Sequence, residues 1–313
     1  MRSVALIYNP ASGQYSARRK AAVEEVLGVM RSAGVEADAF VSETVGSAEE
    51  FTKQAVREGR DAIIACGGDG TVHAVLQSLV GTETALGVIP LGTANALASN
   101  LGLIGSPAKA ARKLVDAVPT LVPVGRIHFE NGSGPESRYF LVAAGVGADA
   151  LLMSRMEPGL KRKLGYALYM IEAFKIWATH PFPLFEASFS SNGLGPERTT
   201  QVSQLLAVRI RSFGGVLNQF VPGATLHSDA LHLIAFGTRK RLDYFNFLMA
   251  ALAGRHSFAK NIELVETATV QCRAINGDTL YVEADGEVLG HLPARMESVP
   301  DAVMLLVPRG AQP

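Results

Sequence analysis

Residues 63–79 read IIACGGDGTVHAVLQSL, and this stretch decides the fold class of the N-terminal half of the chain. A short, fully apolar run leads into the glycine-rich loop Gly67–Thr71 and then directly into a segment with helical spacing. A strand this apolar is typical of a parallel sheet covered by helices on both faces. Glycines at its end let a ligand approach the backbone, and the free N–H groups of a helix N-terminus favour an anion such as phosphate.

Strand and helix patterns alternate on both sides of this stretch, up to residue 101. The apolar runs predict strands at residues 4–8, 35–41, 61–66 and 86–89. The spacing of apolar residues predicts helices at 16–33, 47–58, 71–79 and 94–101, and Ser47 with Glu50 forms a plausible capping box for the second. This alternation predicts a Rossmann-like parallel α/β domain.

The pattern changes from Pro119 onward. Short strands separated by Gly, Pro and Ser clusters indicate an antiparallel β-sandwich, interrupted by a mainly helical insertion at about residues 151–177. The terminal strand, residues 302–307, is apolar enough to pack on either sheet. The fold class is therefore α/β plus β, with an α/β domain of residues 1–118 plus 295–313 and a β-rich domain of residues 119–294.

Composition excludes several classes of protein. Of the 313 residues, 48% are hydrophobic and 19% are charged, which excludes a disordered chain. Lys plus Arg and Asp plus Glu number 29 each, so a nucleic-acid binder that depends on net positive charge is not expected. Two cysteines, Cys66 and Cys272, are too few for a disulfide framework and suit a reducing cytoplasm. We expect no signal peptide and no membrane span, because every apolar run is too short.

Two further glycine loops, Asn9–Gly13 and Pro90–Asn95, also follow predicted strands. Open α/β sheets bind ligands at the carboxyl ends of their strands, so all three loops are expected to face one crevice. Asp69 would repel a phosphate there unless it holds a metal ion or accepts a proton, and catalysis is the simplest explanation. The sequence contains neither a Walker phosphate loop nor an H-R-D kinase loop. Gly145–Ala150 fits a G-x-G-x-x-A pattern, but it opens no clear βαβ unit and is interpreted as structural.

Four motifs carry a family resemblance. NPASG at 9–13, GGDGT at 67–71, PLGTAN at 90–95 and ADGE at 284–287, in this order, resemble the diacylglycerol kinase catalytic-domain family. Along almost its whole length the chain is similar to small soluble bacterial lipid kinases, a group related to sphingosine and ceramide kinases. NAD kinases share the GGDGT loop, but the PLGTAN and DGE segments resemble lipid kinases more closely.

The resemblance implies a kinase that uses ATP and Mg²⁺ to phosphorylate a lipid hydroxyl, with diacylglycerol or a related glycerolipid as acceptor. Asp69 would orient the nucleotide through water and Mg²⁺, and Glu287 in the DGE segment would accept the proton of the hydroxyl. Asp285 of the same segment is also expected among the catalytic residues. Asp69 could also be the base, and both assignments stay open. By position, the residues around the nucleotide would be Asn9, Pro10, Ala11, Ser12, Gly13, Thr44, Gly67, Gly68, Asp69, Gly70, Thr71, Val72, His73, Thr93 and Asn95.

The resemblance also implies a structural Mg²⁺ site in the β-rich domain, with the Asp229 side chain and the carbonyls of Leu226 and Leu231 as ligands. This chain has Ala230 where relatives carry glycine, and an aspartate in a turn also serves as a cap, so both interpretations of Asp229 stay open. The chain also has Ala96 where many relatives carry Asp or Asn, and we expect no polar side-chain contact from that position.

A lipid kinase takes its substrate from a membrane surface. The insertion at 151–177 is rich in large apolar and basic residues, and Arg239–Arg241 is a second basic cluster. Both segments are candidates for peripheral membrane contact. The alternative for the insertion is a helix packed on the β-rich domain, and the alternative for Arg239–Arg241 is a solvated hairpin end. The expected location is the cytoplasm, with peripheral attachment to the membrane as an alternative. The oligomeric state is left open, and a homodimer is one possibility. The alternative functions are an NAD kinase-like enzyme and a non-catalytic nucleotide- or lipid-binding protein.

Overall fold

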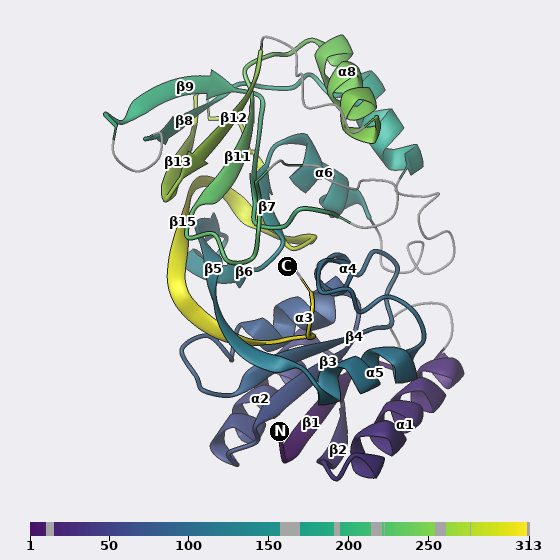
Figure 1. The fold of residues 1–313 in the computed structure, drawn as a ribbon. Helices are drawn as coiled ribbons and strands as arrows, with labels where there is room; N and C mark the ends of the chain where they lie inside the picture. The colour runs from purple at the N-terminus through teal and green to yellow at the C-terminus, as the bar shows by residue number, and fades with distance from the viewer. Residues whose placement is uncertain are drawn as a thin grey trace. The chain divides into compact units, whose positions relative to one another are not determined.

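The computed structural model describes residues 1–10, 16–156, 170–190, 195–213, 221, 223–253, 261–275 and 277–311. The chain forms two compact units (Figure 1). Unit 1 comprises Met1–Pro123 and Asp301–Pro313, and unit 2 comprises Val124–Pro300. Among the described residues, no helix combines the length and the apolarity that crossing a membrane requires.

Unit 1 is built on a parallel sheet, as the sequence predicted. The strands are β1 (Ser3–Tyr8), β2 (Glu36–Val41), β3 (Ala62–Gly67) and β4 (Ala85–Pro90), in the spatial order β4-β3-β1-β2. Every residue of β3 is buried, which explains why its run is apolar without alternation. The end of β15 pairs in parallel with β4 through Leu305 and Leu86, so the terminal strand joins this sheet.

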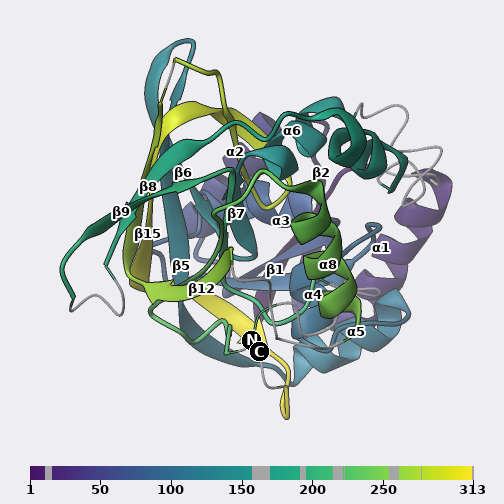
Figure 2. The same ribbon diagram turned by 90° about the horizontal axis from the view of Figure 1, so that it is seen from above.

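Helices cover both faces of this sheet. Helices α1 (Ser16–Ser32) and α5 (Pro107–Val115) lie on one face, and α2 (Val45–Arg57) and α3 (Asp69–Leu76) lie on the other (Figures 1 and 2). Helix α2 begins earlier than predicted. Its cap is Thr44, whose hydroxyl accepts the Ser47 N–H at 3.1 Å, while the Ser47 hydroxyl accepts the Thr44 N–H at 3.0 Å. The capping box therefore uses Ser47 as its second member and not as its first.

The strand order creates a topological switch point between β1 and β3. The chain leaves β1 toward β2 on one side, whereas β3 and β4 lie on the other side of β1. The helical connections therefore diverge there, and open α/β sheets place ligands at the carboxyl ends of the strands at such a point. Two of the three predicted loops follow β1 and β3.

Unit 2 is an antiparallel β-sandwich, as predicted. One run of strands has the order β12-β11-β10-β7-β14-β15, while β13, β8 and β9 continue from β15 on a second path, and β5 pairs with β15 and β6. Phe140, Phe185 and Phe189 lie in the core with side chains from most of these strands. The strand bounds are β5 (Val118–Asn131), β6 (Gly134–Phe140), β7 (Ala143–Val146), β8 (Phe185–Phe189), β9 (Arg198–Val202), β10 (Gln204–Val208), β11 (Leu231–Phe236), β12 (Ile262–Thr267), β13 (Thr269–Ala274), β14 (Tyr281–Ala284) and β15 (Glu287–Val307).

The described helices of unit 2 are α6 (Ala148–Arg155), residues 170–179 and α8 (Arg241–Leu252). The predicted insertion is helical where it is described, and residues 157–169 lie outside the described residues. The hairpin expected at Arg239–Arg241 is wrong, because this cluster begins α8. Helix α8 carries apolar side chains on opposite sides, so its sequence shows no helical period of apolar residues.

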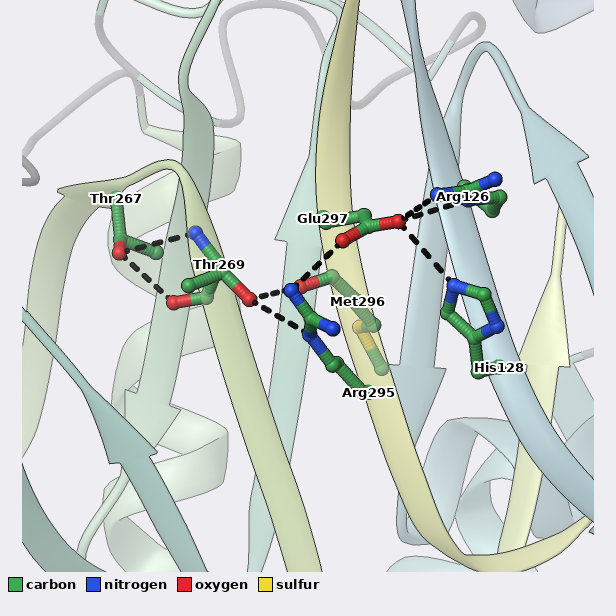
Figure 3. Close-up of polar contacts among 7 residues, drawn as sticks. All are labelled: Arg126, His128, Thr267, Thr269, Arg295, Met296 and Glu297. Atoms are coloured by element: carbon green, nitrogen blue, oxygen red, sulfur yellow. Dashed lines mark hydrogen bonds and ion pairs between the residues drawn. The ribbon is translucent and has the colours of Figure 1, made fainter.

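Polar contacts hold β5 and β13 to β15 inside unit 2 (Figure 3). Glu297 on β15 accepts hydrogen bonds from Arg126 and His128 on β5 and forms an ion pair with Arg295 at 2.9 Å. Arg295 also donates to the Thr269 hydroxyl on β13 at 3.4 Å. Burial alone would raise the pKa of Glu297, but the hydrogen bonds from Arg126 and His128 lower it. This cluster is a structural cross-link.

Candidate active site

Hydrogen bonds connect the described parts of the three glycine loops of unit 1, whereas the expectation that they face one crevice stays a prediction. Buried Arg19 on α1 donates to the Asn9 carbonyl at 3.1 Å and to the Leu91 carbonyl at 2.6 Å. The Leu91 N–H donates to the Gly67 carbonyl at 2.9 Å. Arg19 therefore ties the loop after β1 to the loop after β4. The sequence did not single it out, because nothing local separates it from its basic neighbours.

Glycine is required where two of the loops touch. A Cβ atom on Gly92 would lie 2.4 Å from the Gly68 Cα atom and 2.8 Å from the Asn95 side-chain oxygen. Asn95 is itself fixed with φ of 51°, and its side chain accepts the Gly92 N–H and donates to the Gly92 carbonyl, both at 2.9 Å. The loops after β3 and β4 therefore pack backbone against backbone.

Asp69 begins α3 and contacts the next loop. Its Oδ1 atom accepts the Ala96 N–H at 2.8 Å, at the start of α4 (Ala96–Asn100). Position 96 thus makes its polar contact through the backbone, although its side chain has no polar atom. Helix α3 itself has Gly68 at its N-cap and no side-chain cap among the described residues. Amides at such a helix start favour an anion.

The other predicted nucleotide contacts have varied surroundings. Asn9, Pro10, Gly70 and Thr71 are half-buried, and Thr93 is exposed. Val72 and His73 are buried within α3, which favours packing as their role. The Thr44 hydroxyl caps α2. Ala11, Ser12 and Gly13 lie outside the described residues.

The resemblance implies that these loops hold the phosphates of ATP, and on that prediction we expect Gly92→Ala to weaken ATP binding about tenfold or more. The added methyl group must push apart two backbone segments, and such overpacking costs about 1–3 kcal/mol. Isothermal titration with ATP and Mg²⁺ checks this. The control is Gly28→Ala in α1, where a Cβ meets nothing within 4 Å. Unchanged ATP affinity in Gly92→Ala would show that loop contact does not shape the nucleotide site.

Asp285 in unit 2 anchors a tight turn. Asp285 and Gly286, with φ of 50° and 85°, connect β14 to β15 as a two-residue hairpin, the conformation that Asp-Gly favours. The buried Asp285 carboxylate accepts the N–H groups of Leu141, Val142 and Ala143 at 3.0, 2.8 and 3.2 Å. Its oxygens are therefore engaged in positioning the turn, while the Glu287 side chain directly after the turn is exposed.

Two further carboxyl groups lie beneath this turn. Glu283 on β14 is buried and accepts the Gly286 N–H at 2.8 Å. Asp149 on α6 has both carboxylate oxygens shielded from solvent, in space left by the missing side chain of Gly145. Burial raises the pKa of Asp149 to about 7, and burial together with the nearby Asp149 raises the pKa of Glu283 well above its usual range. The sequence did not predict this pair, because neither burial nor proximity is visible in it.

The pair predicts an unusual dependence of stability on pH. Both pKa values are raised on folding, so the folded state binds more protons than the unfolded state between about pH 4 and 7. The free energy of unfolding should therefore fall as pH rises through this window, and Glu283→Gln should make this fall smaller. Urea unfolding at pH 5.5 and 8 measures the difference. Glu130→Gln, an exposed carboxylate on β5, is the control, and an equal slope in Glu283→Gln and the parent would contradict the prediction.

A buried cation contacts the predicted metal segment, residues 226–231. Arg209 is fully buried, and its guanidinium donates to the Ser228 carbonyl at 3.0 Å. Burial lowers the pKa of Arg209 to about 10, although the charges of Asp229 and Asp285 act in the opposite direction. Asp229 is exposed, whereas Leu226 and Leu231 are buried.

The positive charge of Arg209 acts on Asp229 and disfavours a divalent cation there. The Mg²⁺ ligand set Asp229, Leu226 and Leu231 stays a prediction that this arrangement does not support. Across the ranges that the structure describes, no three His, Cys, Asp or Glu side chains gather closely enough to hold a metal ion.

Comparison with known proteins identifies both units. Residues 3–127 match the diacylglycerol kinase catalytic domain, and residues 141–307 match the YegS C-terminal NAD kinase beta sandwich-like domain. The chain is 29% identical to a diacylglycerol kinase of Mycobacterium tuberculosis over 98% of this chain and 95% of that protein. It is 25% identical to a diacylglycerol kinase of Bacillus subtilis over 99% of this chain and 97% of that protein.

A crystal structure of a diacylglycerol kinase from Bacillus anthracis has the same fold, with a TM-score of 0.71 and 17% identity over 99% of this chain and 98% of that one. The order of the two matched domains agrees with the α/β and β-sandwich units described above. The chain therefore belongs to the family that joins a diacylglycerol kinase catalytic domain to a YegS-type β-sandwich domain.

Proposed function

We propose that this protein is an ATP-dependent lipid kinase that transfers the γ-phosphoryl group of ATP to a lipid hydroxyl, with diacylglycerol as the first candidate acceptor. The observation that supports it best is the meeting of the glycine loops near the switch point, where α3 begins beside Asp69. Backbone amides at this place suit the phosphates of a nucleotide. The name that the bacterial relatives carry supports the same reaction.

The residues of the chain would divide the chemistry as follows. The loops of unit 1 would hold the phosphates, and Mg²⁺ would enter with ATP as part of the substrate, which explains a carboxylate at Asp69 among anion-binding amides. Glu287 would accept the proton of the lipid hydroxyl as its oxygen attacks the γ-phosphorus and the bond to ADP breaks. Asp285 would hold the turn that carries Glu287. Asp69 stays the alternative base.

Transfer of labelled phosphate from ATP tests the proposal. The acceptors are diacylglycerol, other glycerolipids, sphingoid bases and NAD, each with Mg²⁺. We expect a labelled phospholipid. Labelling of NAD alone would favour the NAD kinase-like alternative, and ATP binding without transfer to any acceptor would favour a non-catalytic protein.

A further inference from the structure

The two helices after α6 in unit 2 carry an unusual concentration of exposed apolar side chains. Seven of the fifteen exposed large hydrophobic residues in the described ranges lie on residues 170–179 and on α8. Their exposed fractions range from 37% to 64%. We call this set the apolar face: Met170, Ile171, Phe174, Leu242, Phe245, Leu248 and Met249.

Helix α8 is apolar on two opposite sides. Tyr244, Phe247 and Ala251 point inward, where the Tyr244 and Phe247 rings lie 4.7 and 5.0 Å from the Phe236 ring. Leu242 and Phe245, one turn apart, lie on the opposite side of the helix and are exposed. A helix that only packed on the sandwich would be polar on its outer side, so the outer apolar stripe needs another explanation.

The helix at residues 170–179 and α8 contact each other through Trp177. The Trp177 indole N–H donates to the Arg241 carbonyl at 2.9 Å, and the Arg241 side chain donates to the Trp177 carbonyl at 2.8 Å. The Trp177 ring lies 5.6 Å from the Phe174 ring and 6.3 Å from the Phe245 ring. An aromatic bridge therefore joins the exposed stripes of both helices.

Positive charge borders the apolar face. Five exposed basic side chains accompany two acidic ones, so the set carries a net charge of +3. Glu172 pairs with Lys175 at 2.7 Å, and Asp243 accepts hydrogen bonds from Thr238 and Asn261. Burial lowers the pKa of His180, and the nearby charges of Arg155 and Arg241 lower it further. The basic set is Arg155, Lys175, Arg239, Lys240 and Arg241.

Lys240 and Arg241 stand at the N-terminus of α8, where the helix dipole disfavours cations. Arg241 is held there because its side chain donates to the Trp177 and His180 carbonyls. No such contact is described for the Lys240 side chain, and an external anion would make its placement favourable.

We propose that the apolar face docks on an anionic membrane surface, with Leu242, Phe245 and Phe174 entering the interface and the basic side chains contacting lipid headgroups. An exposed apolar stripe bordered by basic residues is the pattern of helices that lie in the membrane interface. The inference rests on the proposed lipid substrate, because a lipid acceptor is the reason for a kinase to visit a bilayer.

Vesicle co-sedimentation of the full chain tests the docking surface. We expect binding to vesicles of phosphatidylcholine with phosphatidylglycerol and weak binding to phosphatidylcholine alone. L242S/F245S and Lys240→Glu should each weaken binding to the anionic vesicles about tenfold. The matched controls, Leu264→Gln for an exposed apolar residue of unit 2 and Lys53→Glu for an exposed lysine of unit 1, should bind like the parent.

Three outcomes separate the hypotheses. Parent-like vesicle binding by L242S/F245S would overturn the docking surface, whatever the kinase assay gives. Conversion of a dimer to a monomer by L242S/F245S in analytical ultracentrifugation, with vesicle binding unchanged, would assign the face to a second copy of the chain. Phosphorylation of short-chain diacylglycerol in solution should be unchanged in this variant. Failure of the parent to phosphorylate this and every other lipid acceptor would refute the proposed function and leave the membrane result standing.

Discussion

Replacing Glu287 by glutamine should lower kcat for phosphoryl transfer by about 10²- to 10⁴-fold, the range that a general base contributes. Glutamine keeps the shape of the side chain but cannot accept the proton of the lipid hydroxyl. The side chain is exposed beside a turn that other residues hold, so the thermal unfolding temperature should not change. Steady-state kinetics with labelled ATP and calorimetric unfolding measure the two effects.

Two comparisons make the Glu287 experiment decisive. Glu130→Gln removes an exposed carboxylate from the same unit and should leave kcat unchanged. Asp69→Asn tests the alternative base, since asparagine can still accept the Ala96 N–H through its side-chain oxygen. Normal turnover in Glu287→Gln with loss of turnover in Asp69→Asn would move the base assignment to Asp69.

Asp285→Ala should destabilise unit 2 by about 3–5 kcal/mol. Removal of the carboxylate leaves the buried N–H groups of Leu141, Val142 and Ala143 without their acceptor, and each unmet buried donor is costly. Urea unfolding of the purified variant measures the loss. Replacing the two carboxylates of the D-G-E segment should therefore have different effects: loss of Asp285 lowers the free energy of unfolding, and loss of Glu287 lowers kcat.

Asp301 provides a matched control for this stability effect. It also has a left-handed backbone, with φ of 46°, but its side chain is exposed and no hydrogen bond is described for it. Asp301→Ala therefore measures the backbone strain alone, about 1 kcal/mol or less. Similar losses in Asp301→Ala and Asp285→Ala would show that the three amide contacts add little.

Much of the fold could be predicted from short stretches of sequence. The buried run of β3 and its glycine loop predicted the parallel strand and helix that the structure contains. The Asp-Gly pair predicts the hairpin between β14 and β15 for a similarly local reason, since both residues adopt the positive φ angles that the turn needs. Helix α8 could not be predicted in this way, because a helix apolar on both sides has no period to detect.

The candidate site shows the same limit. The sequence located the glycine loops, but it did not indicate that Arg19 bridges two of them or that the Ala96 backbone, and not a side chain, contacts Asp69. The placement of Thr44 near the nucleotide stays a prediction, and the sequence did not indicate that the Thr44 hydroxyl caps α2. A capping or bridging contact depends on which groups the folded chain brings within about 3 Å of each other.

The sequence by itself determined the α/β plus β class and the order of the motifs, because strand burial, helix periodicity and turn conformation depend on neighbouring residues. Only the tertiary structure decided which carboxylates are buried and what they hold. Asp285 and Leu141 are 144 positions apart, yet they share a hydrogen bond. Asp149 on α6 likewise helps to raise the pKa of Glu283 on β14, after burial. Burial and long-range pairing are properties of the packed chain, so only the tertiary structure separates Asp285, whose buried carboxylate holds the turn, from exposed Glu287.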